Sequence, residues 1–238
     1  MKILAIIPAR GGSKGIKNKN IRQFAGRPLI SYAINSAKKS KYIDRVIVST
    51  DSDQIAKVAK KYGAEVPFLR PANLAQDKSS VVDAVIHLLK NLARENYKPD
   101  YIILLQPTSP LRTVEDIDGA IKLILKNKAE SLVSVCATEQ LVFTKKSNHI
   151  LNLASSKSFL KSLNRQELPP TYKLDGSMIY IVKTNAFLKN KLFLTNRTIG
   201  YVIPRWQAVD LDEPEDFVVG ELIYKNINSV KNRIKNFK

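Results

Sequence analysis

The residues best suited to chemistry lie near the start of the chain, where a short apolar run ends in a basic, glycine-rich loop. The run Ile3–Ile7 is followed by Pro-Ala-Arg-Gly-Gly-Ser-Lys-Gly-Ile-Lys-Asn-Lys-Asn over positions 8–20. Glycines at 11, 12 and 15 allow close approach of a ligand to the backbone amides, because no Cβ blocks it. Cationic side chains at 10, 14, 17 and 19 surround those amides. Such a loop is typical of a polyphosphate or other anion site. It matches neither the P-loop nor the dinucleotide fingerprint, so an ordinary basic turn stays an alternative.

A second feature is an acidic turn, Val-Asp-Leu-Asp-Glu-Pro-Glu-Asp-Phe, over positions 209–217. Asp210 and Asp212 alternate along an extended segment, so both carboxylates face the same side. Paired carboxylates are hard oxygen ligands that suit Mg²⁺. The alternative is helix capping, with Asp212 as the N-cap and the following acids stabilised by the helix dipole. In a chain of net charge +18, an acidic cluster opposite a basic phosphate loop favours a metal–polyphosphate site.

Three more polar loops contain groups that could contact a substrate. Gln-Pro-Thr-Ser-Pro-Leu-Arg at 106–112 follows an apolar run and offers an amide and hydroxyls, which suit a polyol or a base edge. Segments 70–77 and 165–172 each begin with an arginine, and Arg165 could clamp a carboxylate. Each loop could also be merely structural. His87 lies in an amphipathic stretch and His149 in a polar one, so neither predicts catalysis or a zinc site.

The elements that must position these residues alternate along the chain. Short aliphatic runs at 3–7, 45–49, 101–105 and 132–135 are typical of buried parallel strands. Between them, 29–40, 53–62, 81–95 and 114–126 show helical spacing. The pattern predicts an α/β fold with a mostly parallel sheet flanked by helices in three layers. Ligands bind such sheets at the carboxyl ends of the strands, where the glycine-rich, Ser-Thr-Asp (49–51) and Gln106 loops should share one rim.

Composition and pattern limit the remaining possibilities. A chain of 238 residues predicts a single domain, and poor apolar alternation over about 138–171 predicts an insertion that serves as a lid or dimerisation arm. With one cysteine and no leader or membrane-spanning segment, we expect a cytoplasmic protein. The basic C-terminal segment has apolar residues at 223, 227, 230, 234 and 237, which favours a packing helix over a membrane or RNA contact. The net charge alone suggests a nucleic-acid-binding protein, but no recognised motif supports that alternative.

The ordered motifs together resemble a known family. Ile-Pro-Ala-Arg-Gly-Gly-Ser-Lys-Gly at 7–15, Val-Ser-Thr-Asp at 48–51, Arg-Pro-Ala-Asn-Leu-Ala at 70–75, Leu-Gln-Pro-Thr-Ser-Pro-Leu-Arg at 105–112, Arg-Gln-x-Leu-Pro at 165–169 and Asp-x-Asp at 210–212 occur in this order. This set resembles the acylneuraminate cytidylyltransferases, or CMP-sialic acid synthetases, over essentially the whole chain. The resemblance implies a nucleotidyltransferase-type (Rossmann-like) fold, a homodimer built with a small swapped arm, and no nucleic-acid partner.

The resemblance also implies a reaction and a set of residues. The family joins CTP to a nonulosonic acid with release of pyrophosphate and needs Mg²⁺ as cofactor, and the anomeric hydroxyl attacks the α-phosphate. It implies Lys19, Asp210 and Asp212 as catalytic residues, the two aspartates also being the metal ligands. The implied nucleotide-binding residues are Arg10, Gly12, Ser13, Lys14, Lys19, Asn20, Arg70 and Ser80. The implied sugar-binding residues are Gln106, Ser109, Arg165 and Tyr180.

Two departures from the family pattern affect the sugar half of the site. Asp175-Gly176 stands where sialic-acid members usually have Asn-Gly, and Lys191–Leu194 lacks the paired aromatic residues of those members. Both raise the expectation of a related sugar, such as legionaminic or pseudaminic acid. The eight-carbon acid Kdo is a further alternative, because its activation uses the same chemistry.

Overall fold

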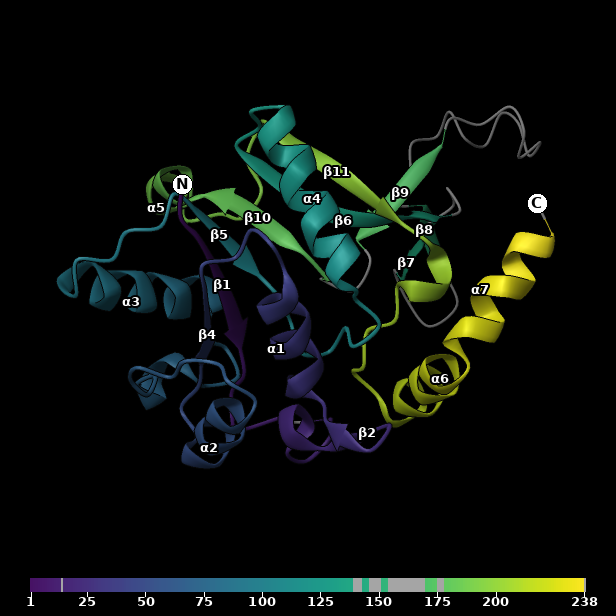
Figure 1. Ribbon diagram of the computed structural model, residues 1–238, viewed down its shortest axis with the longest axis horizontal. Helices are drawn as coiled ribbons and strands as arrows, with labels where there is room; N and C mark the ends of the chain where they lie inside the picture. The colour runs from purple at the N-terminus through teal and green to yellow at the C-terminus, as the bar shows by residue number, and fades with distance from the viewer. Residues whose placement is uncertain (14, 139–142, 146–150, 154–169, 175–177, 238) are drawn as a thin grey trace.

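A mixed seven-stranded sheet forms the middle layer of the computed structural model (Figure 1). The structure describes the chain except residues 14, 139–142, 146–150, 154–169, 175–177 and 238. The strands of this sheet are β1 (Ile3–Pro8), β4 (Arg45–Ser49), β5 (Tyr101–Leu104), β6 (Ser131–Thr138), β9 (Thr171–Leu174), β10 (Tyr180–Lys183) and β11 (Thr198–Ile203). The helices are α1 (Ile30–Lys39), α2 (Asp53–Lys61), α3 (Val81–Arg94), α4 (Val114–Lys126), α5 (Thr184–Asn190), α6 (Pro214–Lys225) and α7 (Ile227–Asn236).

The strand order is β11-β6-β10-β5-β1-β4, and β9 pairs antiparallel with the C-terminal half of β6. Strand β1 pairs in parallel with β4 and with β5, and β11 pairs in parallel with β6. Strand β10 runs antiparallel to both β5 and β6. The carboxyl ends of β1, β4 and β5 therefore meet at one edge, and the amino end of β10 joins them there, as Tyr180 pairs with Leu104. The predicted mostly parallel α/β sheet is confirmed.

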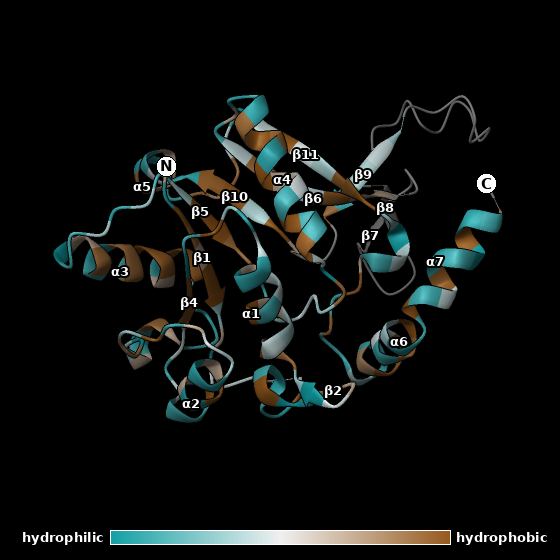
Figure 2. Cartoon of the chain, in the orientation of Figure 1, coloured by the Kyte–Doolittle hydropathy of each residue, from teal (hydrophilic) through white to brown (hydrophobic). Residues whose placement is uncertain are grey.

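Alternation along the strands divides the core into two layers. Side chains of Ile3, Ala5 and Ile7 pack with α1, α2 and α4 on one face of the sheet. Side chains of Leu4 and Ile6 pack with α3 and α5 on the other face. Figure 2 shows β1 and β4 as almost continuously hydrophobic, as expected of strands that are covered on both faces.

A third, smaller cluster joins the N-terminal loop to the C-terminal part of the chain. Ile16, Phe24, Leu29, Leu211 and Phe217 are buried together. The ring of Phe24 meets those of Tyr32, Phe217 and Tyr224 edge-on, with centroids 5.3, 6.2 and 5.8 Å away. Phe24 lies in the short hairpin of β2 (Gln23–Phe24) and β3 (Arg27–Pro28). This cluster brings helix α6 against the segment that follows β1.

The predicted helices are confirmed to within about two residues, and local capping explains their starts. Ser52 accepts a hydrogen bond from the amide of Ile55, and Thr113 and Asp116 form a capping box at the start of α4. Sequence analysis did not predict the short helix α5, which buries only Phe187.

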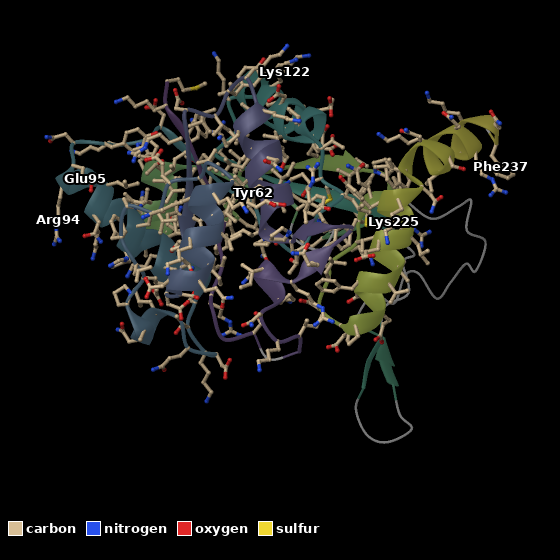
Figure 3. The ribbon with its side chains drawn as sticks, turned by 60° about the horizontal axis from the view of Figure 1, so that its bottom comes forward. Tyr62, Arg94, Glu95, Lys122, Lys225 and Phe237 are labelled. Carbon is tan, nitrogen blue, oxygen red and sulfur yellow. The ribbon has the colours of Figure 1, made fainter. Side chains whose placement is uncertain are left out.

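The expectation for the C-terminal segment is wrong in one respect. The final helix is broken at Asn226 into α6 and α7, and α7 contains no buried residue. Phe237 is 90% exposed, and Figure 3 shows it at the free end of α7, away from the sheet. The apolar residues of α7 are therefore exposed or only partly buried within the described part of the chain.

The insertion at 138–171 falls partly within the described residues. Strands β7 (Phe143–Lys145) and β8 (Leu151–Leu153) pair antiparallel as a separate two-stranded sheet. The dimerisation role of this arm stays a prediction. No helix of the described chain combines the length and apolar character needed to cross a bilayer.

Candidate active site

A cavity of about 520 Å³ opens at the edge of the sheet where β1 and β5 end. Its wall comes from the glycine-rich loop, segment 70–81, the loop after β5 and the acidic turn. Seven of the predicted site residues line it: Arg10, Ser13, Lys19, Asn20, Arg70, Gln106 and Asp212. A second cavity of about 570 Å³ shares Gly15 with it and lies against α6, but none of the predicted catalytic residues line it.

The glycine-rich loop is fixed by contacts that leave cationic side chains on the cavity wall. The buried side chain of Asn20 donates through Nδ2 to the carbonyl of Arg10 at 3.0 Å. The amide of Gly11 donates to Asp51 Oδ1 at 2.9 Å, which ties the loop to the end of β4. The guanidinium of Arg10 donates to the carbonyl of Gln76 at 3.0 Å and lies 3.2 Å from Asp77 Oδ1. These contacts hold the loop in one conformation, with the cationic side chains of Arg10 and Lys19 on the cavity wall.

Arg70 reaches the cavity from a buried position. Its Nε donates to Ser49 Oγ at 3.1 Å, and its Nη2 donates to the carbonyl of Ser49. Burial lowers the pKa of this guanidinium, although the nearby Asp51 opposes the effect. The fixed cation adds positive potential to the cavity, which the nearby Asp51 partly offsets.

The acidic turn is pinned to the loop after β5. The amide of Leu211 donates to the carbonyl of Thr108 at 2.9 Å, and the Leu211 side chain is fully buried in the third cluster. As a result Lys19 Nζ lies 2.7 Å from Asp212 Oδ1, although the two residues are 193 positions apart. This contact joins the basic loop to the acidic turn within one cavity, as the sequence predicted.

The alternative of Asp212 as a helix N-cap is wrong. The N-cap of α6 is Glu213, and the helix begins at Pro214. Asp216 Oδ2 accepts hydrogen bonds from the amides of Asp212 and Glu213 at 3.0 and 2.8 Å. Because Asp216 satisfies these amides, the Asp212 carboxylate stays available on the cavity wall.

Asp210 has the environment of a cation ligand. Its Oδ1 atom is buried and has no hydrogen-bond partner in the described structure. Burial raises the pKa of this carboxyl to about 6, with smaller opposing effects from the Thr108 hydroxyl and Lys19. A buried carboxylate without a partner is costly unless a cation or a donor meets it. The pair Asp210 and Asp212 therefore fits a hard divalent ion such as Mg²⁺.

Two carboxylates do not complete a metal site. Within the described ranges, no group of three or more His, Cys, Asp or Glu side chains could hold a metal ion. An ion at this turn would need further oxygen ligands from water or from a ligand such as a polyphosphate.

The predicted sugar-binding residues are placed unevenly. Gln106 lines the cavity, and its carbonyl accepts from Arg112 Nη2 at 3.1 Å. Ser109 is buried in the same loop. Tyr180 begins β10 at the same edge of the sheet, and its ring lies 5.9 Å from that of Phe193. Neither Ser109 nor Tyr180 lines the cavity itself.

The remaining predicted residues differ in position. Gly12 belongs to the glycine-rich loop and Asp210 to the acidic turn, but neither is among the residues that line the cavity. The Ser80 hydroxyl accepts from the Val82 amide at 3.1 Å as the N-cap of α3, while its neighbours Ser79 and Val81 line the cavity. Lys14, Arg165, Asp175 and His149 lie outside the described residues. His87 packs edge-on against Phe68, with ring centroids 5.6 Å apart, and its Nε2 lies 3.2 Å from Asn91 Nδ2, so it has a structural role.

Sequence analysis assigned no individual role to two acidic residues that shape this cavity. Asp51 holds the amide of Gly11, and Asp77 pairs with Arg10. Thr108, whose hydroxyl was among the groups expected to contact a substrate, lines the cavity with Gln106. The position of Asp51 directly after a predicted strand was a usable signal. Nothing in local spacing identifies Asp77 as the partner of Arg10, because the pairing bridges two loops.

Comparison with known proteins assigns the chain to a family. The family model described as Cytidylyltransferase matches residues 4–215. A CMP-N,N'-diacetyllegionaminic acid synthase of Legionella pneumophila is 39% identical over 93% of this chain and 95% of that protein. A pseudaminic acid cytidylyltransferase of Campylobacter jejuni is 34% identical over 94% of this chain and 97% of that protein. An N-acylneuraminate cytidylyltransferase of Escherichia coli is 35% identical over 97% of this chain, which spans 54% of that longer protein.

A solved structure supports the fold. A CMP:2-keto-3-deoxy-manno-octonic acid synthetase complexed with CTP matches with a TM-score of 0.68 at 16% identity, over 95% of this chain and 99% of that one. The nucleotidyltransferase-type fold predicted from the resemblance is confirmed. With a family model covering most of the chain and relatives above 30% identity at nearly full length, the chain belongs to the cytidylyltransferase family.

Proposed function

We propose that this protein is a CMP-nonulosonic acid synthase that transfers the cytidylyl group of CTP to a nine-carbon α-keto acid sugar. The observation that carries the proposal is the contact between the basic loop and the acidic turn, Lys19 Nζ to Asp212 Oδ1 at 2.7 Å. It combines cations for a triphosphate with carboxylates for a divalent ion in one cavity. The family membership and the near-full-length relatives make CTP the nucleotide and a sugar acid the acceptor.

In the proposed reaction, the anomeric hydroxyl oxygen of the sugar attacks the α-phosphorus of CTP. The new phosphorus–oxygen bond forms as the bond from the α-phosphorus to the α–β bridging oxygen breaks, and pyrophosphate leaves. The hydroxyl proton passes to solvent. Arg10, Lys19 and Arg70 bind the negative charge of the nucleotide, and Asn20 keeps the loop in shape by holding the carbonyl of Arg10.

Asp210 and Asp212 would hold Mg²⁺ together with phosphate oxygens. When bound, the ion neutralises charge that develops on the phosphates during transfer. Without it, Asp212 is paired with Lys19, and Asp210 has a buried oxygen that no described group satisfies. Gln106, with Ser109 and Tyr180 at the same edge of the sheet, is the proposed contact region for the sugar.

Among sugar acids, we favour diacetylated legionaminic acid as substrate over N-acetylneuraminic, pseudaminic and Kdo acids. The support is the 39% identity to the legionaminic enzyme over 95% of its length, together with the two departures from the sialic-acid pattern at Asp175 and Lys191–Leu194. We also propose that the protein acts as a homodimer in the cytoplasm.

The direct test measures pyrophosphate release from CTP and Mg²⁺ with each of the four sugar acids. We expect the largest kcat/KM with the legionaminic acid. Release with none of the four would contradict the proposed function, whereas a preference for another sugar would contradict only the substrate choice. Replacing CTP by UTP serves as a control for the nucleotide.

A further inference from the structure

Two buried oxygen atoms beside the proposed metal ligands have no partner in the described structure. Thr108 is only 7% exposed, and its Oγ1 atom is buried without a hydrogen bond. Asp210 Oδ1 is likewise buried without a hydrogen bond. The main chain keeps the two residues close, because the Leu211 amide donates to the Thr108 carbonyl at 2.9 Å. The Thr108 hydroxyl is also near enough to lower the pKa of the Asp210 carboxyl.

The two groups have complementary hydrogen-bonding capacity. A threonine hydroxyl donates one hydrogen, whereas an ionised carboxylate only accepts. A buried hydroxyl and a buried carboxylate oxygen each destabilise the fold while they stay without a hydrogen-bond partner. Outer partners of metal-ligating carboxylates fix which oxygen faces the ion, and removing them weakens metal binding.

We propose that Thr108 is a positioning residue that donates its hydroxyl hydrogen to Asp210 Oδ1 when a divalent cation is bound, so that the second carboxylate oxygen faces the cavity beside Asp212. This role rests on the proposed function, because it requires Asp210 to be a cation ligand. In this role Thr108 acts through Asp210 and does not touch the reacting atoms. A hydroxyl that served only the sugar would leave cation affinity unchanged.

The test compares Thr108→Val with Thr108→Ser in the full-length protein. Valine keeps the shape of threonine but cannot donate, and serine keeps the hydroxyl. Mn²⁺ alone is the probe, titrated into each protein at pH 7.5, with free Mn²⁺ followed by electron paramagnetic resonance. We expect T108V to weaken Mn²⁺ binding about 10- to 100-fold and T108S to stay within about threefold of the wild type.

Thr184 offers a matched control. Its Oγ1 atom is also buried without a partner, and it follows β10 at the end opposite Tyr180. Thr184→Val therefore repeats the same chemical change away from the cavity, and we expect wild-type Mn²⁺ affinity. Binding of CTP in EDTA should be equal for wild type and T108V, because the nucleotide contacts remain.

The outcomes separate this proposal from the proposed function. If the wild type binds Mn²⁺ and T108V binds it with the same affinity, the proposed role of Thr108 is overturned, whereas the metal role of Asp210 stands. An equal loss in T184V or in T108S overturns it as well, because the effect would then not depend on the hydroxyl at position 108. Absence of Mn²⁺ binding by the wild type removes the metal role of Asp210 from the proposed function, and this proposal with it.

Discussion

Replacing Asp210 with Asn should make the protein more stable at neutral pH while removing its activity. Burial raises the pKa of Asp210 from 3.8 to about 6, so the fold disfavours the charged carboxylate. Asparagine has nearly the same shape and carries no charge, so it avoids that cost. Loss of a cation ligand should reduce turnover by at least about a hundredfold, since such residues stabilise developing charge.

The size and the pH dependence of this gain in stability follow from the difference between the folded and unfolded pKa values of Asp210. A shift of about two units at 1.36 kcal/mol per unit gives roughly 3 kcal/mol, which solvent screening at this partly exposed group reduces to about 1–2 kcal/mol. Because the folded state holds the proton more tightly than the unfolded state, wild-type stability falls as pH rises from 3.8 to about 6. Above that range the penalty is complete. At 2–4 °C per kcal/mol for a chain of this size, we expect D210N to melt roughly 2–8 °C higher at pH 7.5 and at the wild-type temperature near pH 4.

The assay is thermal unfolding in EDTA across pH 4–8, followed by circular dichroism. Asp212→Asn is the matched control, because the Asp212 side chain is 66% exposed and its pair with Lys19 is at the surface. We expect D212N to change stability by no more than about 1 kcal/mol. In a second series at pH 7.5, with Mg²⁺ in place of EDTA, the melting temperature of the wild type should rise and that of D210N should stay unchanged. A D210N protein that is no more stable than the wild type at pH 7.5, or whose gain is independent of pH, would refute the reasoning.

Four further substitutions test other parts of the site. Asp212→Ala should abolish turnover with the fold intact, and normal activity at saturating Mg²⁺ would return the acidic turn to a structural role. Gly15→Ala should lower both kcat and the melting temperature, since its Cβ would lie 3.0 Å from the Asp212 carbonyl oxygen, whereas a Cβ at Gly12 meets nothing within 4 Å. Gly12→Ala should therefore leave the melting temperature unchanged, and equal effects of the two alanines on stability would contradict this difference. Arg70→Lys should raise KM for CTP about tenfold or more through loss of the two bonds to Ser49, and an unchanged KM would place Arg70 outside the nucleotide site.

Turnover should also depend on pH through Asp210. At limiting Mg²⁺, we expect the rate to decline as pH falls through about 6, because the protonated carboxyl cannot bind the cation. Saturating Mg²⁺ should move the decline to lower pH by competing with the proton. A profile that Mg²⁺ does not shift would contradict the assignment of Asp210 as a cation ligand.

The elements of the fold were largely predictable because their signals are local. Strands β1, β4 and β5 are short aliphatic runs, and α4 begins at a Thr113–Asp116 capping box that the sequence contains in full. The break at Asn226 was not predictable from apolar spacing, because the spacing continues through it. Whether α7 packs depends on what faces it, which spacing does not encode.

The sequence predicted which loops form the site, but it did not predict the contacts between individual residues of those loops. The rule that ligands bind at the carboxyl ends of parallel strands brought the glycine-rich and Gln106 loops together correctly. The acidic turn follows no strand of that parallel set directly, and its place opposite Lys19 came from the opposite signs of charge and from the family resemblance. The contact of Asp77 with Arg10 joins two loops at a distance that only the fold determines.

The physical reason for the contact between Lys19 and Asp212 lies in the third hydrophobic cluster, away from any charge. Leu211 and Phe217 belong to the acidic turn, whereas Ile16 precedes Lys19 and Phe24 follows it in the N-terminal part of the chain. Their burial holds the two ends of the chain together more strongly than one exposed ion pair could, since such pairs contribute at most about 1 kcal/mol. The ion pair at 2.7 Å is therefore a consequence of apolar packing. A ligand can then displace Lys19 from Asp212 without separating the two segments, which allows the same pair of groups to bind phosphate and cation.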